Sequence, residues 1–405
     1  MKIYISGISG TGMGPLALMA KEAGMEVVGS DLARGAIYDE LIRTGIEVSI
    51  GKQDGEFLKK ELDGLDWFVY TSALPDEHPE LKLAREAGVK CTKRDDFTAF
   101  LVKNLGLKMV AVAGTHGKTT TTAMIVFAAL ELGLPVSYVV GTTLGFAPSG
   151  NYRKGDKYFV YEADESDRNF LKYRPWLAAE TFVSYDHPDI YPTEKDYRQA
   201  FLQFEQQSEM VIHPSENTER FELAGAVRRA DADLALQAIS KMAADNGTAF
   251  DESEIINILN KFPGVGRRFE RLAEGIYSDY AHHPEEIAAT MEVAQEQAKM
   301  DGRKGVVVVY QPHQNTRQHK VRAGYRGAFD GAEKVFWLPT YLTREDPNLA
   351  ILTPEDLYAG IGMAETAQVS NDLFEDILKW RDAGYLMILM TAGPADEWLR
   401  EKLGA

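Results

Sequence analysis

Residues 109–123 read MVAVAGTHGKTTTTA and join an apolar segment to a helical one through a glycine loop. The apolar segment is rich in β-branched valine and ends at Gly114, and a helix-compatible segment begins near Lys118. Gly114 and Gly117 therefore lie between a strand and a helix. Glycine lets the backbone bend so that its N–H groups, with the helix N-terminus behind them, converge on an anion. The stretch predicts a phosphate-binding loop.

Each polar side chain of this loop suits a nucleotide triphosphate. Lys118 can bring a positive charge toward the β- and γ-phosphates, and the Thr119 hydroxyl can ligate Mg²⁺. The usual pattern has four residues between its glycines, whereas here only two separate Gly114 from Gly117. The position between strand and helix supports the prediction more than the spacing does. The predicted nucleotide contacts are Gly114, Thr115, His116, Gly117, Lys118, Thr119 and Thr120.

Composition excludes several classes of protein. The chain has 405 residues, which predicts two or three domains. Its net charge of −17 argues against nucleic acid or an anionic membrane surface as main partner. One cysteine, Cys91, excludes a disulfide framework and fits a reducing compartment. No apolar run approaches the roughly 18 residues of a membrane span. We expect a cytoplasmic protein, monomeric or homodimeric.

Residues 1–107 alternate strand and helix patterns. A strand over residues 2–6 leads into a glycine-rich turn, and a second strand over residues 26–30 ends at Asp31. This order predicts a Rossmann-like βαβ opening, although its glycines are spaced G-x-x-G-x-G. A helix is predicted over residues 14–23 between these strands. Further strands are predicted at residues 67–71 and 89–91.

Acidic residues follow a later strand. The segment KYFVYEADESD carries apolar residues 158–161 and then four carboxylates, the first of them Glu162. Acids at the carboxyl end of such a strand can hold Mg²⁺ beside a phosphate loop. A second apolar segment, TFVSYDHPDIY, stops at Asp186 and His187. A charge cluster alone is more often a solvated turn, but two such strand ends in order favour a functional site.

The last third of the chain carries cations and histidines at strand ends. FPGVGRRFE is a linker by composition and contains Arg267 and Arg268. IYSDYAHHPEEI and GVVVVYQPHQNTR each describe a strand followed by a polar loop. A single histidine in such a place is usually a packing residue. Three of them in two loops, His282, His283 and His313, predict a shared pocket.

Six motifs in order, GTHGKTTT, EADES, DH, GRRFE, DYAHHP and QPHxxTR, resemble the Mur ligases, above all their alanine-adding branch. This resemblance implies three α/β domains. These are a Rossmann-like UDP-sugar domain at 1–107, a P-loop ATP domain at 108–263 and a Rossmann-like amino-acid domain at 264–405. The chain departs from the family in its central region, because residues 210–251 form a shorter stretch than is usual there. Phe201 stands where many Mur ligases carry a carbamylated lysine, as is usual in the alanine-adding branch.

The resemblance also implies roles for single residues. In the first domain, substrate contacts fall on Gly10, Thr11, Gly12, Asp31 and Ser72. Thr119 and Glu162 match the ligands of a first Mg²⁺, and His187 matches a ligand of a second. Arg268 would face the transferred phosphoryl group, Arg317 the carboxylate of the amino acid, and Asp279 the nucleotide. Tyr280, His282, His283 and His313 would complete the amino-acid pocket.

The implied reaction is ATP- and Mg²⁺-dependent formation of an amide between L-alanine and the lactyl carboxylate of UDP-N-acetylmuramate, through an acyl phosphate. Two positions depart from the family pattern. Asp233 stands at the place of a nucleotide-holding asparagine, and Gln314 replaces an arginine of the amino-acid pocket. Two alternatives stay open: a recycling ligase that attaches a tripeptide to the same sugar, and a non-catalytic protein that binds nucleotide or UDP-sugar. A P-loop motor lacks both the loop spacing and a nucleic-acid surface.

Overall fold

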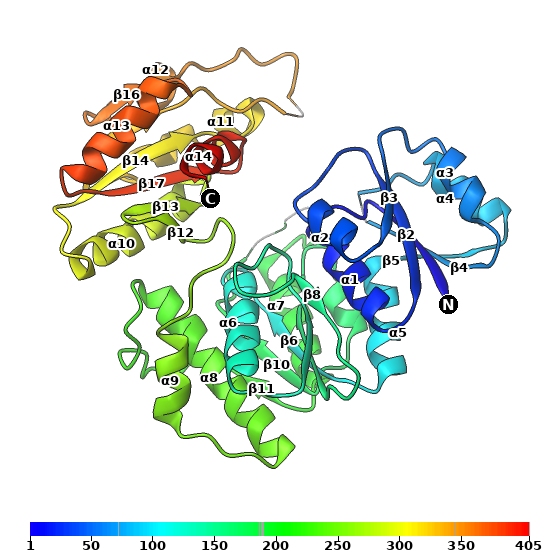
Figure 1. Cartoon of the computed structure of the whole chain (residues 1–405). Coiled ribbons are helices and arrows are strands. Elements are labelled where there is room, and N and C mark those ends of the chain that lie inside the picture. The colour runs from blue at the N-terminus through cyan, green and yellow to red at the C-terminus, as the bar shows by residue number, and fades with distance from the viewer. Residues whose placement is uncertain (72, 186, 188–189, 344, 405) are drawn as a thin grey trace. The chain divides into compact units, whose positions relative to one another are not determined.

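A computed structural model describes residues 1–71, 73–185, 187, 190–343 and 345–404. Three α/β sheets follow one another along the chain (Figure 1). Two compact units contain them: Met1–Glu222 with Val227–Phe262, and Leu223–Ala226 with Pro263–Ala405. The first unit holds two sheets and the second unit holds one.

The first sheet is parallel throughout and has the strand order β3-β2-β1-β4-β5. Its strands are β1 (Lys2–Ser6), β2 (Glu26–Asp31), β3 (Glu47–Ile50), β4 (Leu65–Tyr70) and β5 (Lys90–Lys93). Its helices are α1 (Gly14–Glu22), α2 (Tyr38–Arg43), α3 (Glu56–Glu61), α4 (Pro79–Glu86) and α5 (Arg94–Leu105). Successive strands are added on one side of β1 as far as β3, and the chain then crosses to the other side of β1 to form β4 and β5. The order of the strands therefore reverses between β1 and β4, although all of them are parallel. The loops after these two strands therefore open on a crevice where ligands bind in folds of this kind.

The second sheet has the order β11-β10-β6-β9-β7-β8, and only β8 is antiparallel to its neighbour. Its strands are β6 (Lys108–Ala113), β7 (Val136–Val139), β8 (Gly150–Asn151), β9 (Tyr158–Glu162), β10 (Leu177–Glu180) and β11 (Val211–Ile212). Its helices are α6 (Lys118–Glu131), the 3-10 helix η1 (Asn169–Lys172), α7 (Glu194–Gln206), α8 (Ala226–Asn246) and α9 (Glu252–Leu259). Because β6 lies between β10 and β9, the loop after β6 meets the ends of both neighbours.

The two sheets of the first unit share one hydrophobic core. Trp67 and Phe97 of the first sheet layer belong to the same buried cluster as Phe159 of the second. Polar contacts reinforce this junction, since the Glu40 carboxylate accepts hydrogen bonds from the Ser149 backbone at 2.9 Å and from its hydroxyl at 2.8 Å. The pair of sheets thus forms one packed body.

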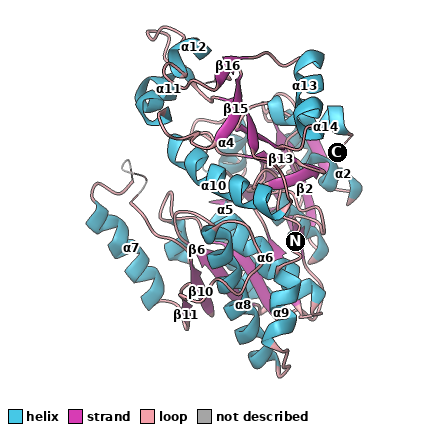
Figure 2. Cartoon of the chain, turned by 90° about the vertical axis from the view of Figure 1, so that its left-hand side faces the viewer, coloured by secondary structure: helices cyan, strands magenta, loops and turns pink. Residues whose placement is uncertain are grey.

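The third sheet has the order β12-β13-β17-β14-β15-β16, with only β12 antiparallel to its neighbour. Its strands are β12 (Glu270–Ala273), β13 (Ile276–Asp279), β14 (Val306–Gln311), β15 (Ala332–Trp337), β16 (Ala364–Thr366) and β17 (Leu386–Thr391). Its helices are α10 (Pro284–Met300), α11 (Asn315–Val321), the 3-10 helix η2 (Arg322–Tyr325), α12 (Pro354–Leu357), α13 (Asn371–Asp382) and α14 (Ala395–Leu403). Helices cover both faces of this sheet (Figure 2). Val306 and Val308 face the α10 side, and Val307 and Val309 face α13 and α14, so the run VVVV is buried throughout.

The predicted α/β class with three sheets is confirmed. The predicted helix after the phosphate loop corresponds to α6, and most predicted strands differ from the observed ones by one or two residues. The division of the chain at residues 107 and 263 stays a prediction. Within the described part of the chain, we find no helix with the length and apolar character that crossing a membrane requires.

Candidate active site

The phosphate loop joins β6 to α6. Two of its glycines are in close contact with neighbouring side chains, Gly114 with Thr181 and Gly117 with Asp231. Gly114 and Gly117 have φ values of +137° and +85°, which side-chain-bearing residues rarely adopt. A Cβ on Gly114 would lie 1.9 Å from Thr181 Oγ1, and one on Gly117 would lie 2.5 Å from Asp231 Oδ1. Both positions therefore require glycine. The Thr181 hydroxyl also donates to His116 O at 2.5 Å, so the end of β10 holds the loop from outside.

Lys118 is the cation of this loop. Its Nζ donates to Gly114 O at 2.7 Å and to Thr115 O at 3.2 Å. It also lies 2.9 Å from Glu165 Oε2. The ammonium group is thus held beside the loop backbone, where it can meet an incoming phosphate.

Thr119 and Glu162 lie together as their predicted shared role requires. Thr119 Oγ1 donates to Glu162 Oε1 at 3.0 Å and to Oε2 at 2.9 Å. Thr119 is the second residue of α6, and Glu162 is the last residue of β9, the strand beside β6. A hydroxyl and a carboxylate are the hard oxygen ligands that Mg²⁺ prefers. The pair fits a magnesium ion at the edge of the phosphate loop.

Glu165 connects this loop with His187 and was not singled out by the sequence analysis. Its carboxylate is 1% exposed, pairs with Lys118 and lies 3.7 Å from His187 Nε2. Tyr197 OH donates to Glu165 Oε1 at 3.4 Å and makes a 2.7 Å hydrogen bond with Thr115 Oγ1. Burial raises the pKa of Glu165, although Lys118 opposes this change. One buried acid therefore lies beside both the lysine, with which it pairs, and the histidine.

The acid that faces the phosphate loop from α8 is Asp231, which the sequence analysis did not single out. Asp231 accepts a 3.0 Å hydrogen bond from Thr121 Oγ1, and burial raises its pKa to about 8. Asp233 instead accepts from Ser215 N at 2.7 Å and pairs with Arg220. Residues two apart on a helix point about 200° apart, so only one of the two acids can face the loop.

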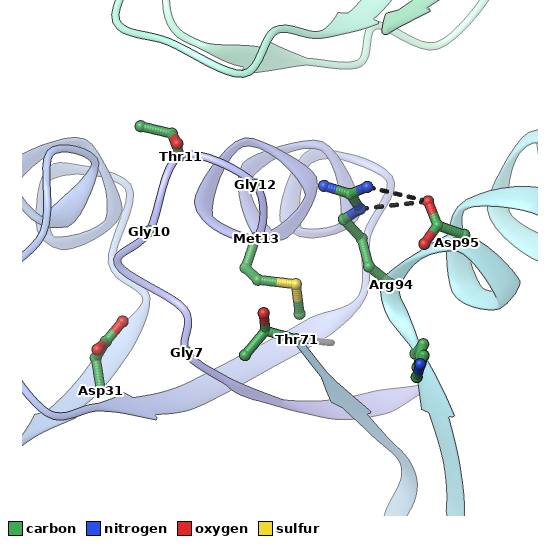
Figure 3. A pocket seen from close by; sticks show the side chains of 10 residues that line it. Gly7, Gly10, Thr11, Gly12, Met13, Asp31, Thr71, Arg94 and Asp95 are labelled. Carbon is green, nitrogen blue, oxygen red and sulfur yellow. Dashed lines mark hydrogen bonds and ion pairs between the residues drawn. The ribbon is translucent and has the colours of Figure 1, made fainter. Parts of the chain in front are cut away.

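The crevice of the first sheet forms a cavity of about 350 Å³. The predicted Gly10, Thr11, Gly12 and Asp31 line it, together with Arg94 (Figure 3). Asp31 is partly engaged by the turn after β1, because Oδ2 accepts from Ser9 N at 2.9 Å. Ser72 lies outside the described residues.

Arg94 brings a positive charge to this cavity, which the sequence analysis missed. It begins α5, directly after β5, and its Nη2 pairs with Asp95 at 3.2 Å (Figure 3). A Cβ on Gly12 would lie 3.0 Å from Arg94 Nη1, so the guanidinium reaches the glycine turn. The basic dipeptide Lys93-Arg94 at the end of a strand was the signal available in the sequence. A glycine turn with a cation beside it suits a diphosphate group.

The second unit brings several of the residues predicted for an amino-acid pocket close together. The rings of Tyr280 and His282 are 5.4 Å apart, and those of His282 and His313 are 5.7 Å apart. The Arg268 guanidinium lies 5.4 Å from the Tyr280 ring. The loops after β13 and β14 therefore meet at His282 and His313, and the pocket shared by three histidines stays a prediction.

Arg317 and His282 give this pocket its chemistry. Arg317 Nη1 is buried and has no hydrogen-bond partner among the described residues, which leaves a guanidinium N–H for a ligand. The pKa of His282 is lowered, first by burial and also by Arg317, although Glu286 opposes the change. His282 Nδ1 lies 2.9 Å from Tyr280 O, an acceptor, so Nδ1 carries the proton and Nε2 the lone pair.

Two predicted residues of the second unit, Asp279 and His283, are hydrogen-bonded to the protein itself. Asp279 Oδ2 accepts from Phe269 N at 2.7 Å, and Oδ1 accepts from Ala281 N at 2.8 Å. His283 stands before Pro284 at the start of α10 and forms a capping box with Glu286. Asp279 thus fixes the two loops that carry Arg268 and Tyr280. Its predicted contact with nucleotide stays a prediction.

Comparisons with known proteins agree on one family. Residues 2–104 match the model of the Mur ligase family, catalytic domain, and residues 112–255 match the Mur ligase middle domain. The UDP-N-acetylmuramate--L-alanine ligase of Kineococcus radiotolerans is 32% identical over 86% of this chain and 83% of its own length. The enzyme of the same name from Campylobacter jejuni is 31% identical over 88% of this chain and 90% of its own length.

Solved structures show the same fold. A UDP-N-acetylmuramate-alanine ligase from Thermotoga maritima superposes with a TM-score of 0.78, at 23% identity, over 100% of this chain and 98% of that one. A murein peptide ligase from Psychrobacter arcticus gives a TM-score of 0.61 at 21% identity, with 100% and 98% coverage. Fold and site define an enzyme of the ligase class. The chain belongs to the Mur ligase family. Both the predicted family and the predicted enzyme class are confirmed.

Proposed function

We propose that this chain joins L-alanine to the lactyl carboxylate of UDP-N-acetylmuramate, with ATP and Mg²⁺, in peptidoglycan precursor synthesis in the cytoplasm. The observation that carries the proposal is the Thr119–Glu162 pair beside Lys118, because oxygen ligands next to a loop lysine are suited to a magnesium ion and a triphosphate. The names of the relatives at 30–32% identity support the choice of sugar and amino acid. The lactyl carboxylate would first be activated by phosphorylation, and the amino group of alanine would then react with it.

The residues of the two units divide the work of this reaction. Lys118 would neutralise the triphosphate, Thr119 and Glu162 would hold one Mg²⁺, and His187 would hold a second. These ions would withdraw charge from the transferred phosphoryl group. The lactyl carboxylate attacks that group and forms an acyl phosphate with release of ADP. The amine of alanine then attacks the acyl carbon and releases phosphate.

The amino-acid side of the reaction falls to the pocket of the second unit. The unpartnered Nη1 of Arg317 is suited to the carboxylate of alanine. Its lowered pKa keeps His282 neutral at pH 7, and its Nε2 carries the lone pair. It is therefore our candidate for the group that takes the amine proton. Arg268 is exposed and stacks on Tyr280, from where its charge can stabilise the transferring group.

The second candidate is a tripeptide-adding ligase acting on the same sugar. It is favoured by the murein peptide ligase among the structural relatives and by Gln314, where an arginine is expected in the alanine-adding branch. Purified protein should be given UDP-N-acetylmuramate, ATP and Mg²⁺ with L-alanine, glycine, L-serine or L-alanyl-γ-D-glutamyl-meso-diaminopimelate. ADP release that is largest with L-alanine supports the proposal. Release with the tripeptide alone replaces it with the second candidate.

A further inference from the structure

Three potential metal ligands lie together in the first unit, and none belongs to the site described above. One ligand atom each from Glu180, Glu205 and His213 lies within 4.8 Å of the other two. Glu180 ends β10, Glu205 lies in the last turn of α7, and His213 directly follows β11. β11 is the edge strand beside β10, and α7 runs alongside them (Figure 2).

The backbone itself brings two of these residues together. In the parallel pair of β10 and β11, Ala178 lies opposite Val211 and Ala179 opposite Ile212. The next step of the same register places Glu180 beside His213. Residues in register on adjacent strands direct their side chains to the same face, at a strand separation of about 4.8 Å. The juxtaposition therefore follows from strand pairing and does not depend on one side-chain rotamer.

The charge of this group is unbalanced. Glu180 is 8% exposed, and its buried Oε2 has no hydrogen-bond partner. Among the described residues, neither Glu180 nor Glu205 is paired with a lysine or arginine. Burial and the neighbouring Glu205 raise the pKa of Glu180 to about 7. Two carboxylates placed side by side in this way need either a shared proton or a cation.

The geometry suits a small transition-metal ion. His213 Nε2 lies 3.7 Å from Glu205 Oε1, close to the roughly 3.4 Å that separates two ligand atoms of a tetrahedral zinc ion. The His213 side chain is 55% exposed, which leaves an open path for the ion and for a water ligand. An imidazole with two carboxylates suits Zn²⁺, for which histidine nitrogen and carboxylate oxygen are common ligands.

We propose that Glu180, Glu205 and His213 bind one Zn²⁺ ion, with water at the remaining position. Bound there, the ion ties together the ends of β10, α7 and β11. Thr181, the residue after Glu180, holds the phosphate loop through its hydroxyl. The ion therefore steadies the strand end that supports the nucleotide loop.

The test uses the full chain stripped of metal by chelation. Zn²⁺ or Co²⁺ is added alone, and bound metal is counted by elemental analysis after gel filtration. We expect one tightly bound ion, a Co²⁺ visible absorption band and a higher Tm. His213→Ala and Glu180→Gln should each weaken binding at least tenfold and remove the Co²⁺ band.

Two matched variants distinguish this ion from others. Glu209→Gln removes an exposed carboxylate three residues after α7 and should leave Zn²⁺ binding unchanged. Glu162→Gln removes a proposed magnesium ligand and should also leave it unchanged, whatever its effect on ligation. Three results would overturn the proposal: no bound ion, unaltered binding in His213→Ala and Glu180→Gln, or loss of the ion in Glu162→Gln. The first would mean that the two glutamates only share a proton.

Discussion

Lys118 Nζ lies 2.9 Å from Glu165 Oε2, in an ion pair whose side chains are only 13% and 1% exposed. The lysine of the phosphate loop is therefore bound to a buried acid as well as to the loop carbonyls. Its loss would remove a charge from the nucleotide site and leave a buried carboxylate without its cation. The two consequences can be separated by experiment.

Lys118→Ala should lower ADP release in the ligation assay at least about 100-fold, as the loss of a preorganised charge at a developing anion does. It should also destabilise the protein by about 3–5 kcal/mol, because breaking a buried ion pair leaves Glu165 unpaired. Denaturant unfolding measures the second effect. Full activity in Lys118→Ala would contradict the nucleotide assignment.

The double variant Lys118→Met with Glu165→Gln is the control for this pair. It removes both charges and keeps similar side-chain volumes, so most of the lost stability should return. Activity should stay as low as in Lys118→Ala. If activity returned together with stability, Lys118 would act only through folding.

Gly114→Ala should damage the phosphate loop directly. A Cβ there would lie 1.9 Å from Thr181 Oγ1, and the φ of +137° is strained for alanine. We expect a loss of about 1–3 kcal/mol in stability and at least a tenfold weaker affinity for ATP by calorimetry. Gly362→Ala is the control, because a Cβ at that position meets no atom within 4 Å. If the two substitutions lowered stability and ATP affinity equally, the close contact between Gly114 and Thr181 would not be the cause.

Asp231 should make the stability of the protein depend on pH. Its folded pKa is about 8 and its ordinary value is 3.8, so between these pH values the unfolded chain binds fewer protons than the folded one. Folding stability contributed by the protonated acid is therefore lost as the pH rises from 4 to 8. Asp231→Asn should remove this fall in stability with pH. At pH 8 its free energy of unfolding should exceed that of the native chain by at least about 1.4 kcal/mol, the energy equivalent of a shift of one pKa unit.

Asp233→Asn is the matched control on the same helix. Burial alone would raise the pKa of Asp233, but hydrogen bonds from Ser215 and Arg220 outweigh it and the pKa is lowered. Loss of this charge should destabilise the protein at pH 7, opposite in sign to Asp231→Asn. Urea unfolding at pH 5 and pH 8 measures both. If both substitutions changed the free energy of unfolding with the same sign and the same dependence on pH, the two acids would not have the different environments described here.

Arg317→Ala should raise the KM for the amino acid about 10- to 100-fold, since a hydrogen bond to a charged group contributes about 1.5–3 kcal/mol. The KM for the UDP-sugar should stay unchanged. Arg317→Lys should recover only part of the loss, because an ammonium cannot reproduce the planar fork of arginine. Arg322→Ala, on the exposed side of η2, should behave as the native chain. An unchanged KM in Arg317→Ala would remove this residue from the pocket.

Much of the fold and of the site is predictable because it depends on local patterns. Strand ends, glycine turns and the start of α6 follow from residue type and spacing. Thr119 lies in α6, just after the loop that follows β6, and Glu162 ends β9. Because β6 and β9 are adjacent parallel strands, their carboxyl ends lie side by side. Glu165 was not distinguished within EADES, since neighbouring acids differ only in what packs around them. Arg94 was missed because a basic pair after a strand is usually solvent-exposed.

The sequence by itself determined three α/β sheets, the family, and the loops that carry lysine, acids and histidines, because these depend on hydrophobic period and on short motifs. Only the tertiary structure showed that Asp231, and not Asp233, faces the phosphate loop, since two helical positions about 200° apart differ in what they face and not in type. It also placed Glu180 beside His213, 33 residues away along the chain. Strand register, which no local pattern encodes, brings that pair together.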